Sequence, residues 1–201
     1  MPQQQSMYEK AVALIDAANN EDPNQETADG KDWPKELIYS YRMVEMLERF
    51  RPDADEAQKL AIRAQHIQRW KSAREDYSMD RIGYLQWRKD LYKFHANLAG
   101  DLLAQAGYGD DVIGRVKEAV AKKRIKENPD TQLLEDIADL VFIEHYMQAF
   151  VDKHPEYDEE KWIDIILKTW KKMSDSAQQF ALSGKVKLPE PLVPLIQKAV
   201  G

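Results

Sequence analysis

The residues best suited to chemistry begin in the segment LAIRAQHIQRW, which runs from Leu60 to Trp70. If this segment is helical, apolar residues share one side, as a core-facing helix requires: Leu60, Ala61, Ala64 and Ile67. A second side combines an imidazole, an indole and two guanidinium groups around Ile62: Arg63, His66, Arg69 and Trp70. An imidazole can ligate a metal or move a proton, and guanidinium groups can bind a carboxylate or phosphate. The alternative is a histidine that bonds a nearby carbonyl group beside a tryptophan that only packs.

A second imidazole stands in the segment LYKFHANLAG. His95 borders the apolar stripe of this expected helix, and Arg88 and Tyr92 lie on its adjoining turn. We expect His95 to share a polar pocket with His66. The alternative is a core histidine whose hydrogen bonds are satisfied by its neighbours.

Three carboxylates interrupt LLEDIADLVF, the most apolar helical segment of the chain: Glu135, Asp136 and Asp139. Burying a carboxylate without a partner costs several kcal/mol, so each one needs a cation, a donor network or water. A metal ion could supply the positive charge, and so could Arg42 or Arg63. We expect Glu135 and Asp136 to lie in the same pocket as His66 and His95. The alternative is that these carboxylates form structural ion pairs.

The segment from Lys71 to Tyr84 is expected to be a long loop rich in charged residues and tyrosine. Long loops in compact domains are often functional, so we expect its side chains to bind an anionic ligand: Arg74, Tyr77 and Arg81. Residues 63–93 carry eight basic and four acidic side chains, and residues 115–126 carry six basic and one acidic. These basic regions could attract a small anion, or they could simply be solvated helix surfaces.

Composition limits the classes of function. The formal net charge of −6 argues against general binding to nucleic acids. With no cysteine, disulfides, thiolate metal sites and cysteine nucleophiles are excluded. No run of apolar residues is long enough to span a membrane, and the first residues lack the pattern of a secretory signal. We therefore expect a cytoplasmic protein with no membrane partner. Phosphate-binding loops, dinucleotide fingerprints and nucleophile elbows are also missing.

Helical periodicity dominates the sequence and predicts an all-α protein of about seven or eight helices, with no sheet beyond two short strands. One helix is expected to start at a cap on Asp53 or Asp55 and to continue through Trp70. Gly107 should end a long helix, and Asn128 with Pro129 should begin the next but one. The whole chain, 1–201, reads as one domain, with a flexible N-terminus at 1–7 and a proline-punctuated tail at 187–201.

Several segments in this order resemble the domain of unknown function 4202 family: IDAANNEDPN, ELIYSYRM, RAQHIQRW, RIGYLQWR, FHANLAG, LLEDIADLVF and KTWKKMS. The similarity covers almost the entire chain, from about Tyr8 to the tail. It implies a shared fold and brings no established activity.

The order of these segments is also similar, more distantly, to HD-domain metal phosphohydrolases and their di-iron oxygenase relatives. In those families a histidine, a His-Asp pair and a later aspartate hold the metal. Here Arg42 stands at the first position, Gln65 and His66 stand near the pair, and Asp136 or Asp139 stands near the closing aspartate. The ligand set is therefore altered. A different mononuclear site for iron, manganese or zinc is the expectation, with these ligands: His66, His95 and Asp136.

Two functions remain open. The first is an HD-like hydrolase, or alternatively an oxygenase, acting on a small anionic or phosphorylated substrate. Its expected catalytic residues are His66, His95 and Glu135, with the glutamate orienting one imidazole. Its expected substrate-binding residues are Arg42, Arg63, Arg69, Trp70, Arg74, Tyr77, Arg81 and Arg88.

The second function is a non-catalytic binding module for an anionic metabolite, RNA or a protein partner. In that case Arg42 replaces a metal ligand and the carboxylates pair with arginines. The two functions differ in whether the carboxylates face imidazole or guanidinium groups.

Overall fold

The computed structural model describes residues 5–200, and helices dominate them. The first half contains α1 (Met7–Asn20), β1 (Gln25–Ala28), β2 (Lys31–Pro34), α2 (Lys35–Phe50), α3 (Glu56–Arg63), α4 (Arg81–Ala106) and α5 (Asp110–Val120). The second half contains α6 (Pro129–Val141), the π-helical segment η3 (Phe142–Tyr146), α7 (Met147–Asp152), α8 (Glu159–Lys172), α9 (Asp175–Leu182) and α10 (Val193–Val200). Short 3₁₀ turns are η1 (Arg69–Lys71), η2 (Arg74–Asp76) and η4 (Glu190–Leu192). The all-α prediction is confirmed, with ten α-helices within this range rather than seven or eight.

The helix ends follow local sequence signals. Asp55 caps α3 through a capping box, in which its side chain accepts from Gln58 N and the Gln58 side chain accepts from Asp55 N. Asn128 caps α6, with Pro129 as the first helical residue. Gly107 ends α4 with φ of 104°, a left-handed conformation that a residue with a Cβ rarely adopts. These boundaries were predicted from the sequence.

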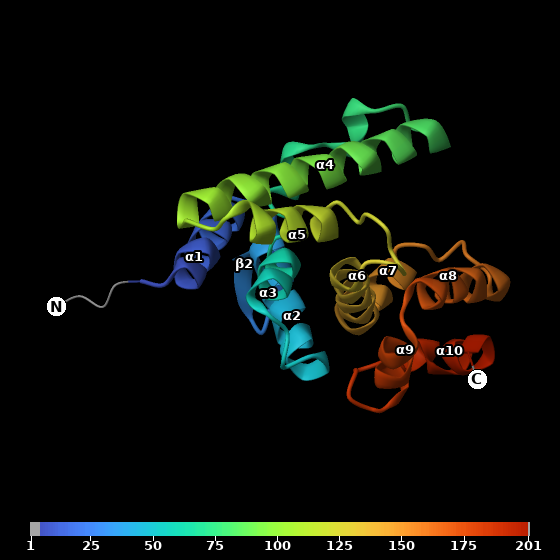
Figure 1. Cartoon of the computed structure of the whole chain (residues 1–201). Coiled ribbons are helices and arrows are strands. Elements are labelled where there is room, and N and C mark those ends of the chain that lie inside the picture. Colours follow the sequence, from blue (N-terminus) through green and yellow to red (C-terminus); the bar gives the residue numbers. More distant parts are fainter. Residues whose placement is uncertain (1–4, 201) are drawn as a thin grey trace.

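The helices form two connected regions (Figure 1). The long helix α4 lies across α1 and α5, and α2 and α3 pack with them. Helix α6 links this region to the C-terminal helices, because it contacts α2 and α5 on one side and α8 and α9 on the other. Fully buried side chains of α1 to α6 form most of the core, such as Ile15, Met43, Leu60, Leu103 and Ile137. The same core continues into the C-terminal helices through Ile166 and Ala177.

A small hairpin of β1 and β2 was not predicted from the sequence. Its two strands pair antiparallel, and its turn residues Asp29 and Gly30 have φ of 52° and 74°. Two left-handed residues in a row are typical of the tight turn that joins hairpin strands. Each strand has only four residues, too few for a clear alternating pattern.

The helix expected to continue through Trp70 ends at Arg63 instead. Gln68 adopts a left-handed conformation with φ of 50°, so residues 64–68 form turns. Side chains from other helices bond this backbone: Gln68 N donates to Asn19 Oδ1 at 3.0 Å, and Ile67 O accepts from His95 Nδ1 at 2.8 Å. These tertiary hydrogen bonds replace the helical ones. The polar and apolar sides of the segment are therefore not two faces of one helix.

Both termini differ from expectation in detail. The tail expected at 187–201 contains η4 and α10, and α10 packs against α8. At the other end, Ser6 caps α1 with a capping box, so the last part of the expected flexible region belongs to a helix start. Residues 1–4 of that region lie outside the described residues. No helix within 5–200 combines the length and apolar character needed to cross a membrane.

Candidate functional site

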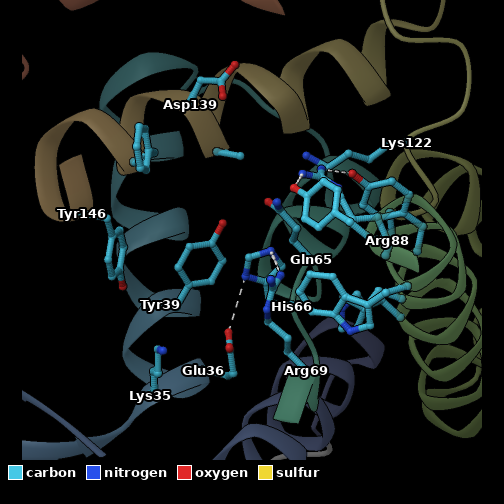
Figure 2. Close-up of a pocket in the computed structure, with 18 residues that line it drawn as sticks. Lys35, Glu36, Tyr39, Gln65, His66, Arg69, Arg88, Lys122, Asp139 and Tyr146 are labelled. Carbon is cyan, nitrogen blue, oxygen red and sulfur yellow. Dashed lines mark hydrogen bonds and ion pairs between the residues drawn. The ribbon is translucent and has the colours of Figure 1, made fainter. Parts of the chain in front are cut away.

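A cavity of about 400 Å³ opens where α2, the α3–α4 connection, α4 and α6 meet. We call it the site cavity (Figure 2). Its lining includes four cationic side chains: Lys35, Arg69, Arg88 and Lys122. It is also rich in aromatic side chains: Tyr39, Tyr84, Trp87, Tyr92, Phe142 and Tyr146. Both histidines expected from the sequence line it, together with Glu36, Gln65 and Asp139.

His66 lies in the turn after α3, and its ring stacks on Tyr39 with centroids 4.4 Å apart. Arg69 Nη1 lies 3.2 Å from His66 Nε2. A guanidinium group can only donate, so Nε2 accepts and the neutral ring carries its proton on Nδ1. That nitrogen lies 3.5 Å from Glu36 Oε2. Burial and the positive charges of Arg69 and Lys122 hold the pKa of His66 well below its usual value, so the ring is neutral at pH 7.

His95 is the second imidazole, and its ring centroid lies 6.0 Å from that of His66. Its side chain is buried, and Nδ1 donates to Ile67 O at 2.8 Å. The remaining nitrogen, Nε2, has no hydrogen-bond partner among residues 5–200. Burial and the neighbouring His66 lower the pKa of His95 to about 3, so this ring is neutral too. The expected proximity of the two imidazoles is therefore present, while their chemical role stays a prediction.

Glu36, in the first turn of α2, was not predicted as a site residue. Its position beside the helix start looks like an ordinary dipole-stabilising acid, and only the fold brings it to His66. The Glu36 side chain is 8% exposed, and burial raises its pKa to about 7. The positive charges of Arg69 and Lys35 lower this pKa, whereas Asp22 raises it. A carboxyl group that titrates near neutral pH can exchange protons with a neighbouring imidazole.

Three of the four cations have no carboxylate partner among residues 5–200. Arg69 contacts His66 and lies 5.2 Å from the Trp87 ring centroid. Arg88 donates to the hydroxyl groups of two tyrosines, Tyr84 at 3.0 Å and Tyr92. Lys35 is exposed and forms no ion pair within the described range. The sequence signal for Arg88 was its spacing from His95 on one helix, whereas Lys35 carried no such signal.

The three carboxylates of α6 face lysine and hydroxyl donors rather than imidazoles. Glu135 pairs with Lys122 and with Lys172, the latter at 2.9 Å, and these ammonium groups hold its pKa below the usual range against the effect of burial. Asp139 pairs with Lys172 at 2.7 Å, and burial raises its pKa. We call these four residues the lysine–carboxylate cluster. Asp139 and Lys122 also line the site cavity, whereas Glu135 lies behind it.

Asp136 points to the C-terminal region. Its carboxylate accepts from Ser174 N at 2.7 Å and from Ser174 Oγ at 2.6 Å, and it does not line the site cavity. The expected metal set of His66, His95 and Asp136 is therefore not brought together. No group of three or more histidine or acidic side chains within 5–200 is placed to hold a metal ion. These residues do not fit a common metal site.

Six residues expected to bind substrate lie outside the lining of the site cavity: Arg42, Arg63, Trp70, Arg74, Tyr77 and Arg81. Arg63 forms a two-bond ion pair with Asp16, at 2.7 and 2.6 Å. Arg42 pairs with Glu26 of the hairpin and donates to Tyr146 Oη at 2.7 Å, so it supports the cavity wall from behind.

The loop residues among those six mostly bond within their own segment. Arg74 donates to the backbone oxygens of Tyr77 and Asp80, and Tyr77 Oη donates to Asp90 at 3.2 Å. Arg81 is exposed at the start of α4, and Trp70 is half-buried in η1. The loop therefore braces the first turns of α4 and supplies none of these side chains to the cavity.

The π-helical segment η3 accounts for two residues that the sequence did not indicate. It follows α6 directly, and its first and last residues, Phe142 and Tyr146, both line the site cavity. A π-helical turn contains an extra residue and so redirects side chains relative to a continuous α-helix. Such turns occur frequently at functional sites.

Comparison with known proteins gives one match. The model of a family described as Domain of unknown function (DUF4202) matches residues 9–196. No curated protein and no solved structure matches the chain. The matched range includes every residue of the site cavity.

Proposed function

The chain belongs to the DUF4202 family, and from this premise we propose that its site cavity binds a small anionic molecule carrying a phosphate or carboxylate group. The observation that carries the proposal is the set of cations around the cavity that lack a carboxylate partner: Lys35, Arg69 and Arg88. The chain has a formal net charge of −6, so carboxylates are plentiful elsewhere. Other arginines do find them, such as Arg63 with Asp16 and Arg115 with Asp130.

Physical chemistry favours an anion over water as the partner of these groups. Hydrogen bonds to charged groups contribute about 1.5–3 kcal/mol each, and more in a partly desolvated cavity. The cavity volume of about 400 Å³ lies in the range of small-molecule sites. Arg69 is further held in place by His66 and Trp87, so little side-chain entropy is lost when it binds a ligand.

We also propose that the helical fold is distantly related to that of HD-domain enzymes. It is supported by the position of Gln65 and His66 directly after α3 and by Asp139 on α6, since all three line one cavity. Arg42, at the position of the first histidine of those enzymes, lies behind the cavity wall. Because the expected ligands do not meet, the proposed function includes no step through a metal.

One observation favours acid–base hydrolysis as a second candidate function: Glu36 faces His66 Nδ1 at 3.5 Å. Arg69 would first turn from His66 Nε2 to the bound phosphate, which frees the lone pair of that nitrogen. The oxygen of a water molecule would then attack the phosphorus of a phosphate ester while His66 Nε2 takes a proton from that water. The ester P–O bond would then break, and the proton would pass to the departing alkoxide. Ionised Glu36 would stabilise the imidazolium group between these two transfers, as a carboxylate does in a catalytic triad.

The binding proposal is tested by isothermal titration with inorganic phosphate and with malonate. Arg69→Met and Arg88→Met should each weaken binding of the anion at least tenfold, because each removes a charged donor from the cavity. Arg81→Met is the matched control, since Arg81 is exposed and lies off the cavity, and it should leave affinity within twofold. Equal affinities in all four proteins would contradict the proposal.

Hydrolysis is tested separately by release of phosphate from a set of phosphate monoesters. Turnover that is lost in Glu36→Gln, while the variant still binds phosphate, would support the second candidate. Binding without turnover in the wild type would leave the chain as a binding module.

A further inference from the structure

The site cavity has two unlike ends. Arg88 and Lys122 lie at one end, on α4 and in the turn after α5, and Arg69 lies between His66 and Trp87. At the other end stands a group of rings from α2 and η3, which we call the aromatic wall: Tyr39, Phe142 and Tyr146. Figure 2 shows Tyr39 and Tyr146 on the side of the cavity opposite Arg88 and Lys122. The cationic end also carries rings, since Trp87 and Tyr92 contact Arg69 and Arg88. A ligand that fills the cavity therefore meets cations among rings at one end and the aromatic wall at the other.

The aromatic wall is open to the cavity and is fixed in position. Its three side chains are only partly buried. The Tyr39 ring stacks on His66 at 4.4 Å and lies 5.9 Å from the Tyr146 ring, and Arg42 holds the Tyr146 hydroxyl at 2.7 Å. The Tyr39 hydroxyl makes no hydrogen bond to residues 5–200. His66 already covers one face of the Tyr39 ring, so another ring would meet the wall at its remaining faces and edges, and edge-to-face contact is an arrangement that aromatic rings favour.

The cations themselves are positioned by rings. The Arg69 guanidinium lies 5.2 Å from the Trp87 ring centroid, and the Arg88 guanidinium lies 5.2 Å from that of Tyr92. A guanidinium group has five N–H donors, of which Arg69 uses one on His66 and Arg88 uses two on tyrosine hydroxyls, so the others stay available for an anion. An inorganic phosphate ion has five heavy atoms and would leave most of the 400 Å³ unfilled.

We infer that the natural ligand is an anion attached to a planar ring, with the anionic group at Arg69 and Arg88 and the ring against the aromatic wall. This inference rests on the proposed function, because the anionic group is what the cations bind. The inference adds that the rest of the ligand, beyond its anionic group, is a planar ring. An anion on a flexible alkyl chain is expected to bind more weakly, since such a chain gains less from rigid ring faces than a planar group does.

The experiment compares matched pairs of probes by isothermal titration: phenyl phosphate with methyl phosphate, and benzoate with acetate. If the cavity binds phosphate groups, phenyl phosphate should bind at least tenfold more tightly than methyl phosphate. If it binds carboxylate groups, benzoate should bind at least tenfold more tightly than acetate. Phe142→Leu keeps an apolar side chain and removes a ring, so it should reduce that preference at least threefold. The same variant should leave affinity for methyl phosphate or acetate within twofold.

The possible outcomes separate the two proposals. If both members of a pair bind equally well, the cavity binds anions and the inference about the ring is wrong. If no probe binds, the proposed function and the inference fall together. Should Phe142→Leu fold poorly, the comparison of probes on the wild-type protein still decides the matter, because it needs no variant.

Discussion

Two neighbouring regions of this protein use the same kinds of charged residue in opposite ways. In the lysine–carboxylate cluster, Glu135 and Asp139 both face Lys172, and Glu135 also pairs with Lys122. In the site cavity, Arg69 and Arg88 bond an imidazole and tyrosine hydroxyls, and neither forms an ion pair with a carboxylate of residues 5–200, although Glu36 lies close enough for the Arg69 charge to lower its pKa. Ammonium and carboxylate groups that pair with one another satisfy each other's charge, whereas cations without a carboxylate partner remain available to a ligand. The comparison teaches that the partners of a charged group, more than its type or burial, separate a structural from a functional role.

The largest expected effect is a loss of stability when the lysine–carboxylate cluster is broken. Glu135→Gln removes the carboxylate from two ammonium groups, and the Glu135 and Lys122 side chains are only 5% and 10% exposed. Leaving a buried charge without its partner costs about 3–5 kcal/mol. Urea denaturation should therefore show a loss of about that size in the free energy of unfolding. The control is Glu118→Gln, whose pair with Arg124 is exposed and should contribute about 0–1 kcal/mol. Equal losses in both variants would contradict the assignment of the cluster as structural.

The next effect is a pH dependence that arises at the edge of the site cavity. Burial raises the pKa of Glu36 to about 7 from an ordinary value of 4.5, so between these pH values the folded protein binds more protons than the unfolded chain. Stability should therefore fall as the pH rises through this window, by roughly 3 kcal/mol in all. Comparison of wild type with Glu36→Gln by urea denaturation isolates this contribution. A variant whose pH profile matches that of the wild type would show that Glu36 titrates normally.

The smallest expected effect is in the loop that the sequence singled out. Arg74→Ala and Arg81→Ala should leave anion affinity within twofold, since neither side chain lines the site cavity. Their effect on the free energy of unfolding should be about 0–1 kcal/mol. The measurement is titration with inorganic phosphate. If the variant that combines both substitutions loses affinity strongly, the loop side chains bind the anion, as the sequence predicted.

The parts of the fold that were predicted correctly depend on local signals. Asp55, Asn128 and Gly107 act through hydrogen bonds or backbone conformation within a few residues, so the sequence alone reveals them. The apolar side of LAIRAQHIQRW is buried as expected, with Leu60 and Ile67 fully inaccessible. The end of α3 was missed because the bonds that redirect the chain come from α1 and α4, far away in sequence.

The candidate site was only partly predictable for the same reason. Histidines are rare in this chain, with four in all, so His66 and His95 were easy to single out. Glu36 and Lys35 are two of many acidic and basic residues at helix starts, and only tertiary packing brings them to the cavity. Asp136 was misassigned because adjacent residues of a helix point in directions about 100° apart, so it faces Ser174 while Glu135 faces the lysines.

Whether the unpaired cations of the site cavity bind an anion is tested most directly by the effect of inorganic phosphate on the thermal unfolding midpoint, which reports stability and binding together. A ligand that binds only the folded state stabilises it by about 2.7 kcal/mol at a concentration 100 times its dissociation constant. The wild-type midpoint should rise by several degrees as phosphate is added, and that of the Glu118→Gln control should rise equally. The double variant Arg69→Met/Arg88→Met should unfold close to the wild-type midpoint without phosphate and should gain almost nothing when it is added. An equal rise in the double variant, or no rise in the wild type, would contradict the central claim that the unpaired cations of the site cavity bind an anion.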